Sequence, residues 1–322
     1  MRKAGGSSGS GSDPVEARSK GPIRLGIAPI GWTNNDLPEL GGDIPLEQCL
    51  TEARMAGFSG VENGAKFPLD AKELKPVLEQ HGLALITGWF SGELRARSLE
   101  DEKQRLRQTL RLYQELGAPV LLYAETTGTV QAQMDVPVSE RPVMPEEEFK
   151  RYGEKLTALA DWLAAEGVPM TYHHHMGTVV ETEREIDLLM THTGPSVGLL
   201  LDTGHLTFAG GEVLATTRRH GPRINHVHCK DLRAEVLARL KAERWSFLKG
   251  VIEGVFTVPG DGMIDFGPFA GVLAEIGYSG WVVVEAEQDP KKANPLEMAR
   301  IGHRALAEAF GNAGFAIADR AA

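Results

Sequence analysis

The feature that most constrains the fold of this chain is a unit that recurs along it: a short apolar strand, a polar break and an amphipathic helix. Eight strands of this kind can be counted, and they are too apolar to face water. Eight parallel strands covered by helices are typical of a closed (β/α)8 TIM barrel, an α/β fold. Strands are expected at 23–30, 60–63, 83–89, 119–123, within 168–177, and at 197–202, 223–228 and 280–285.

Amphipathic segments between these strands predict the covering helices. Thr182 and Glu185 have the spacing of a capping box, which predicts a helix start. The alternative fold is an open doubly wound sheet, but the segment APIGW after the first strand lacks the G-x-G-x-x-G phosphate loop of that fold. Helices are expected at 45–56, 70–80, 99–116, 145–166, from 182, at 266–276 and at 295–310, with a helical insertion at 232–254.

The predicted organisation is one barrel domain over residues 21–312, followed by a C-terminal tail at 313–322. Residues 1–20 are rich in Gly and Ser and contain no apolar run, so they are expected to be a disordered leader or a cloning remnant. No segment approaches the roughly 18 apolar residues that span a bilayer. We therefore expect no membrane partner.

Charge and cysteine content argue against a nucleic-acid-binding protein and against a protein built on cysteine–metal sites. The formal net charge of −10 repels phosphate backbones and argues against a nucleic-acid partner. The two cysteines, Cys49 and Cys229, lie far apart without metal-ligand spacing, which fits a reducing compartment. A cytoplasmic location is expected.

Residues able to bind a ligand or do chemistry end every expected strand. The carboxyl ends of all strands in a barrel converge on one face, so these side chains are expected to share one cavity. They are Trp32 and Asn34, Glu62 and Asn63, Trp89, Glu125, His173, Asp202, His228 and Glu285.

Two imidazoles and two carboxylates end the last four strands: His173, Asp202, His228 and Glu285. Mixed nitrogen and oxygen ligands suit Mn²⁺, Co²⁺, Fe²⁺ or Zn²⁺. His173 belongs to three consecutive histidines, which are interior and follow a strand, so they are not an affinity tag. Strand alternation turns His173 and His175 one way and His174 the other.

Strand seven carries His226, His228 and Lys230 on one side. If that side faces the barrel interior, Lys230 lies above His228, near a substrate oxygen. We interpret His226 as a hydrogen-bonded core histidine. His205, in the turn after strand six, adds another imidazole.

These motifs resemble a known superfamily. The pattern D-x-x-H at 202–205, H-x-H-x-K-D at 226–231 and an apolar run ending in Glu285 is similar to the xylose-isomerase-like sugar isomerases, epimerases and dehydratases. Within it, the segments YHHHMGT and FTVPGDG resemble the inosose dehydratase family. The resemblance extends from about residue 23 to 290.

The resemblance implies one divalent metal, with Mn²⁺ or Co²⁺ favoured over Zn²⁺ or Fe²⁺, bound by His173, Asp202, His228 and Glu285. His173 departs from the family pattern, because a Glu usually holds its position. In related epimerases that Glu and the strand-eight Glu are paired proton-transfer groups. Its replacement therefore favours a hydro-lyase that removes water from a cyclic polyol ketone.

The implied reaction converts 2-keto-myo-inositol (scyllo-inosose) into a trihydroxycyclohexane-1,2-dione in inositol catabolism. The hypothesis for its mechanism has the metal stabilise an enediolate while a base removes the α-proton and an acid assists loss of hydroxide. Candidate bases are Glu285, His205 and Glu62, and candidate acids are Lys230 and His175. Candidate substrate-binding residues are Trp32, Asn34, Asn63, Trp89, Glu125 and Asp261.

Two alternatives remain at this stage. One is an isomerase or 3-epimerase of inososes or ketoses in the same superfamily, against which His173 argues. The other is a non-catalytic, metal-dependent polyol-binding module, which has no need for Lys230 above the metal. The resemblance also implies a homodimer or homotetramer.

Overall fold

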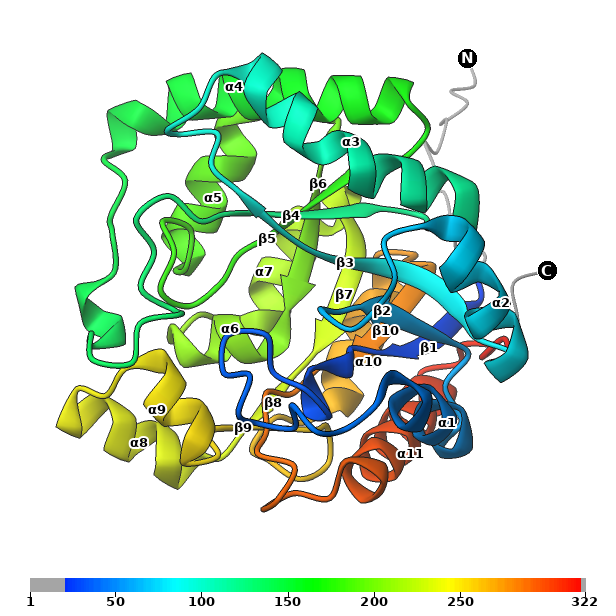
Figure 1. Cartoon of the computed structure of the whole chain (residues 1–322). Coiled ribbons are helices and arrows are strands. Elements are labelled where there is room, and N and C mark those ends of the chain that lie inside the picture. Colours follow the sequence, from blue (N-terminus) through cyan, green and yellow to red (C-terminus); the bar gives the residue numbers. More distant parts are fainter. Residues whose placement is uncertain (1–20, 320–322) are drawn as a thin grey trace, which may run out of the picture.

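The chain forms a closed barrel of eight parallel strands, which confirms the predicted (β/α)8 fold (Figure 1). The computed structural model describes residues 21–319, so the predicted leader at 1–20 lies outside the described residues. Around the barrel the strand order is β1-β10-β7-β6-β5-β4-β3-β2. The barrel strands are β1 (Ile23–Ile27), β2 (Gly60–Asn63), β3 (Ala84–Gly92), β4 (Leu121–Glu125), β5 (Met170–His173), β6 (Val197–Asp202), β7 (Ile224–Cys229) and β10 (Gly280–Val284).

Helices cover the outside of the barrel, and their apolar faces pack on the strands. The predicted capping box begins α5, where the Thr182 hydroxyl accepts a hydrogen bond from the Glu185 amide. Within residues 21–319, no helix is long and apolar enough to cross a membrane. The outer helices are α1 (Leu46–Ala56), α2 (Ala71–His81), α3 (Leu99–Leu116), α4 (Glu146–Ala165), α5 (Glu183–His192), α7 (Val213–His220), α10 (Phe266–Glu275) and α11 (Pro295–Asn312).

Two helices between β6 and β7 were not predicted. The first, α6 (Thr203–Phe208), begins directly after β6, where the Asp202 carboxylate accepts a hydrogen bond from the His205 amide. It is six residues long, too short to show a helical period, and α7 follows it after a brief turn. The Asp202 carboxylate thus has two parts to play: one oxygen caps α6, and the residue is also a predicted metal ligand.

The predicted helical insertion is confirmed and consists of two helices. The first, α8 (Ala234–Glu243), ends at Arg244, which adopts a left-handed conformation with φ of 53°. The second, α9 (Phe247–Ile252), lies beside it. Next to both helices is an antiparallel pair of short strands, β8 (Asp231–Leu232) and β9 (Phe256–Thr257) (Figure 1). This subdomain has its own buried apolar cluster, which includes Leu240, Trp245, Phe247, Leu248, Val251 and Phe256.

The described part of the predicted tail is fastened to β1. The Ile23 amide donates to the Ala316 carbonyl at 3.0 Å, and the Ala318 amide donates to the Ile23 carbonyl at 2.9 Å. Phe315 is buried against the outer core. The tail therefore adds two backbone hydrogen bonds at Ile23, the first residue of β1.

Gly41 holds the loop between β1 and α1 in a conformation that other residues resist. Its φ is +73°, and an added Cβ would lie 1.7 Å from the carbonyl oxygen of Trp32. Gly117, with φ of +72°, has open space at the same place, so it is a matched control.

We expect Gly117→Ala to lower the free energy of unfolding by roughly 1–2 kcal/mol, the cost of left-handed backbone strain alone. Gly41→Ala should lose about 1–3 kcal/mol more, because the clash forces the loop to move. Urea unfolding of both variants measures the difference. Equal losses would show that the close approach of Gly41 to Trp32 does not matter.

Candidate active site

The four predicted metal ligands come together at the carboxyl ends of adjacent strands β5, β6, β7 and β10. One ligand atom from each of His173, Asp202, His228 and Glu285 lies within 4.8 Å of all the others. Asp202 Oδ2 is 3.5 Å from His173 Nε2 and 3.5 Å from His228 Nδ1. Because Asp202 and His228 are paired across β6 and β7, their side chains point inward at the same level.

The polar atoms of this cluster are unusual in being buried and unsatisfied. Within residues 21–319, His173 Nε2, Asp202 Oδ2, His228 Nδ1 and Glu285 Oε2 have no hydrogen-bond partner of acceptable geometry. Buried polar groups are almost always hydrogen-bonded, so a convergent set of unsatisfied atoms marks a site suited to binding a cation. Two imidazole nitrogens and two carboxylate oxygens fit a divalent transition metal.

Burial and neighbouring charges set the protonation states in this cluster. Burial lowers the pKa of His173 and favours the neutral imidazole, the form that binds metals. Burial also lowers the pKa of His228, but Glu285 and Glu62 outweigh it and hold that pKa well above its ordinary value.

Glu62 lies on β2, across the barrel from β7, and contacts two histidines. Its Oε1 accepts hydrogen bonds from His226 Nε2 at 2.9 Å and from His228 Nε2 at 2.8 Å. Burial raises the pKa of Glu62, but the two histidines outweigh it and hold the pKa well below its ordinary value. His226 is buried and hydrogen-bonded, as predicted.

A second polar cluster surrounds Lys230, which is fully buried. Its ammonium lies 2.9 Å from His205 Nε2, 2.8 Å from Glu287 Oε2 and 3.5 Å from Glu285 Oε2. Burial lowers the pKa of Lys230, but Glu285 and Glu287 outweigh it and raise the pKa, so the side chain stays an ammonium. His175, whose ring centroid is 3.9 Å from that of His205, completes this cluster.

Glu287 and two aromatic walls of this cluster were not predicted. Glu287 follows Glu285 by two residues, so the alternation that turns one side chain inward could have indicated the other. Phe256 lies 4.9 Å from the Lys230 ammonium, and Phe247 packs 5.3 Å from the His175 ring. Both belong to the inserted subdomain, and Phe256 covers the ammonium while Phe247 packs against Phe256 and the histidines.

Trp89 and Asn63 line the same cavity as His228 and Glu285. The Trp89 ring lies 5.5 Å from that of His173 and 5.1 Å from that of His175. His174 points elsewhere, since its Nε2 accepts a hydrogen bond from the Asp202 amide at 3.2 Å. The alternation predicted for the three histidines is therefore confirmed.

Trp32 and Asn34 are not placed to bind a ligand, and this corrects the prediction. The Trp32 indole is buried outside the barrel, where its Nε1 donates to Glu52 of α1 at 2.6 Å. Asn34 Oδ1 accepts hydrogen bonds from the amides of Asp36 and Leu37 and so stabilises its own turn. Both residues follow η1 (Pro29–Gly31), and it is their neighbours Thr33 and Asn35 that line the cavity of His228 and Glu285.

The predicted substrate-binding roles of Glu125 and Asp261 are also corrected. Glu125 shares the strand parity of Tyr123, which is paired with Tyr172 and points toward the helices, and its carboxylate accepts from the Arg95 and Thr127 amides. The Asp261 carboxylate accepts from Arg233 at 2.5 Å and from Thr257 at 2.6 Å. Glu125 is therefore buried with both oxygens bonded, whereas Asp261 is exposed, and neither lines the cavity of His228 and Glu285.

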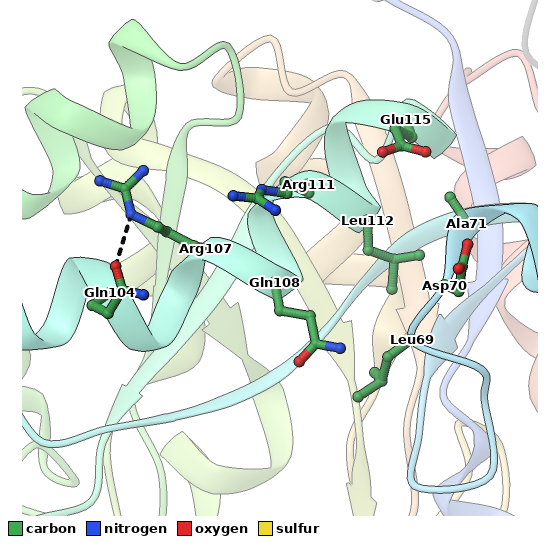
Figure 2. Close-up of a pocket in the computed structure, with 9 residues that line it drawn as sticks. All are labelled: Leu69, Asp70, Ala71, Gln104, Arg107, Gln108, Arg111, Leu112 and Glu115. Carbon is green, nitrogen blue, oxygen red and sulfur yellow. Dashed lines mark hydrogen bonds between the residues drawn. The ribbon is translucent and has the colours of Figure 1, made fainter.

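A depression of about 540 Å³ lies on the outer surface, between the start of α2 and the side of α3. Figure 2 shows Leu69, Asp70 and Ala71 on one side and Arg107, Gln108 and Arg111 along the helix on the other. It contains none of the predicted site residues. The chemistry-bearing side chains gather instead inside the barrel.

The chain belongs to the xylose isomerase-like TIM barrel family, whose sequence profile matches residues 50–309. Relatives at higher similarity include the rhizopine catabolism protein MocC of Rhizobium meliloti, 48% identical over 94% of this chain and 94% of that protein. The inosose dehydratase of Geobacillus thermodenitrificans is 46% identical over 90% of this chain and 98% of that enzyme.

Solved structures agree on the fold. The IOLI protein, described with a binding zinc atom, has a TM-score of 0.64 at 19% identity, covering 89% of this chain and 98% of that chain. At this identity the likeness supports the barrel architecture alone. The arguments about chemistry below rest on the side chains of this protein.

Proposed function

We propose that this protein is an inosose dehydratase, a hydro-lyase that removes water from 2-keto-myo-inositol in inositol catabolism. The observation that carries the proposal is the juxtaposition of an unsatisfied His173–Asp202–His228–Glu285 cluster with the buried Lys230 ammonium. Relatives named inosose dehydratase, between 42% and 46% identical over about 90% of the chain, support the substrate class. The free cysteines, Cys49 and Cys229, suit a cytoplasmic enzyme.

The residues that would hold a divalent metal are His173, Asp202, His228 and Glu285, and Mn²⁺ or Co²⁺ is the proposed ion. A bound metal of this kind supplies Lewis acidity toward a carbonyl oxygen and an adjacent hydroxyl. The surrounding side chains would then carry out the proton transfers.

Lys230 would place a fixed positive charge beside the oxygen that becomes negative when the α-carbon loses its proton. The α-proton would pass to Glu285 or to an imidazole nitrogen of His205, two of the candidate bases. The electron pair of the broken C–H bond forms the enolate, and the C–O bond at the β carbon then breaks. The departing hydroxide takes up a proton from His175, the candidate acid beside His205, and leaves as water, so the ketone becomes an unsaturated ketone, the enol of the dione.

The aromatic and amide residues at the mouth would hold the ring. Trp89 offers an apolar face beside His173 and His175, and Asn63 offers hydrogen bonds to ring hydroxyls. Phe247 and Phe256 exclude water from the Lys230 pocket, which strengthens its electrostatic effect.

The corrected role of Trp32 gives a test. We expect Trp32→Phe to leave KM within about two-fold and to lower the free energy of unfolding by roughly 1–3 kcal/mol, because the bond to Glu52 is lost and the smaller ring leaves part of the buried space unfilled. Trp89→Leu should instead raise KM at least several-fold with little effect on stability. Steady-state kinetics and thermal unfolding separate the two. A raised KM in the Trp32 variant would return that residue to the substrate site.

The rival reaction is epimerisation or isomerisation. It needs two groups that exchange protons on opposite faces of one carbon, and His173 takes the place of one of the expected carboxylates. Glu287 does not replace it, because both of its oxygens contact Lys230. The arrangement therefore favours elimination.

The deciding experiment is turnover of 2-keto-myo-inositol by metal-stripped protein, with Mn²⁺, Co²⁺, Zn²⁺ and Mg²⁺ restored singly. We expect the dione to form only when a metal is present, and its ultraviolet absorbance measures this formation. Consumption of the ketone to an isomer without dione would establish the epimerase alternative. Binding of the ketone without turnover by any metal form would overturn the assigned reaction and support a polyol-binding module.

A further inference from the structure

We infer that Glu62 is a positioning residue, which holds the His228 ring with Nδ1 turned toward the other metal ligands and thereby sets metal affinity. The inference rests on the metal site proposed above. It also removes Glu62 from the candidate bases.

The contacts of Glu62 fix both partners. His226 and His228 lie two residues apart on β7, so their side chains leave the strand on the same side. Both rings direct Nε2 at one atom, Glu62 Oε1, at 2.9 and 2.8 Å. Because the hydrogen bond from His226 holds the carboxylate in place, Glu62 has a fixed position from which to bind the His228 ring.

The orientation of the His228 ring decides which nitrogen a metal would meet. With Nε2 bound to Glu62, Nδ1 lies 3.5 Å from Asp202 Oδ2 and in contact with Glu285 Oε2. A carboxylate on the second nitrogen of a metal-binding histidine fixes the ring orientation and raises its basicity as a ligand. Glu62 occupies that position in this chain.

The same geometry argues against a role in proton abstraction. The two nitrogens of an imidazole diverge, so Glu62 stands behind His228 relative to Asp202 and Glu285. Glu62 contributes to the lining of the cavity beside His228, but its Oε1 already accepts two N–H groups and its side chain is only 4% exposed. A general base has to reach the proton that it removes.

Two variants and one control test the inference. Glu62→Gln keeps the shape and removes the charge, and Glu62→Ala removes the contact. Glu102→Gln is the control, because Glu102 is also fully buried and its Oε1 also accepts two hydrogen bonds, from the Glu93 amide and the Tyr123 hydroxyl, on the outer side of the barrel. Circular dichroism confirms that each variant is folded before use.

The readout is the dissociation constant for Mn²⁺ and Co²⁺, measured by competition with a chelator. We expect Glu62→Gln to weaken binding about 10- to 100-fold and Glu62→Ala at least as much, with Glu102→Gln unchanged. At saturating metal, kcat of Glu62→Gln should stay within about ten-fold of the wild type. Unchanged metal affinity with a lost kcat would overturn the inference and restore the base role.

A second measurement does not depend on metal binding. In crystal structures of the metal-free wild type and Glu62→Ala, we expect the His228 ring to be turned in the variant alone. An unchanged ring would overturn the inference. A wild type that binds none of the added metals would refute the proposed metal site, while the ring orientation would still decide the role of Glu62.

Discussion

His228→Ala is expected to remove both metal retention and turnover. The wild-type ring is the one ligand that contacts carboxylates through both nitrogens, Glu62 through Nε2 and Glu285 through Nδ1. Lewis-acid stabilisation is worth several kcal/mol, and each 1.4 kcal/mol is about a factor of ten in rate. The loss in kcat/KM should therefore be at least about 100-fold.

The matched control for this variant is His81→Ala. His81 closes α2 on the outside of the barrel, where its ring contacts the Val77 carbonyl and Glu47. It should keep wild-type metal content, measured by elemental analysis after gel filtration, and wild-type turnover. If His228→Ala also retained metal and turnover, the proposed ligand set would be wrong.

Lys230→Met should cost both stability and activity. Methionine fills a similar volume but leaves the buried carboxylate of Glu287 without its cation and leaves Glu285 with His228 alone. Breaking a buried pair by removing one partner typically destabilises by about 3–5 kcal/mol. We expect the midpoint of thermal unfolding to fall on the order of 5–10 °C.

The double variant Lys230→Met, Glu287→Gln separates the two effects. Removing the charge of Glu287 relieves most of the unpaired charge, so a large part of the lost stability should return. Turnover should not return, because the positive charge beside the developing enolate is still missing. A single Lys230 variant with full turnover would show that the ammonium is structural only. A double variant without regained stability would show that the Lys230–Glu287 pair is not the source of the loss.

The strands and most helices were predictable because their signals are local. The apolar runs of β6 and β10 and the 18-residue amphipathic α3 lie within two residues of their expected bounds. The short α6 and the β8–β9 strand pair were missed because they have no strong local signal. Two to six residues hold too little periodicity, and the pairing of Asp231 with Thr257 joins segments 26 positions apart.

The residues of the candidate site also fall into those that the sequence could predict and those that it could not. His173, Asp202, His228 and Glu285 were expected together because each ends an apolar strand, and barrel closure brings such ends together. Trp32 and Glu125 also end or follow strands, but their side chains point outward. Position at a strand end is visible in the sequence, whereas the direction of a side chain depends on register against the neighbouring strand.

The sequence alone determined the barrel class and the strands that carry the chemistry, because repeated apolar strands have few ways to bury both faces. Only the tertiary structure decided how those side chains pair. The bond between Glu62 and His228 spans 166 positions, and Lys230 meets Glu287 across 57. Contacts of this kind exist only once the barrel has closed, when burial forces each charged group to find a partner that no local pattern identifies.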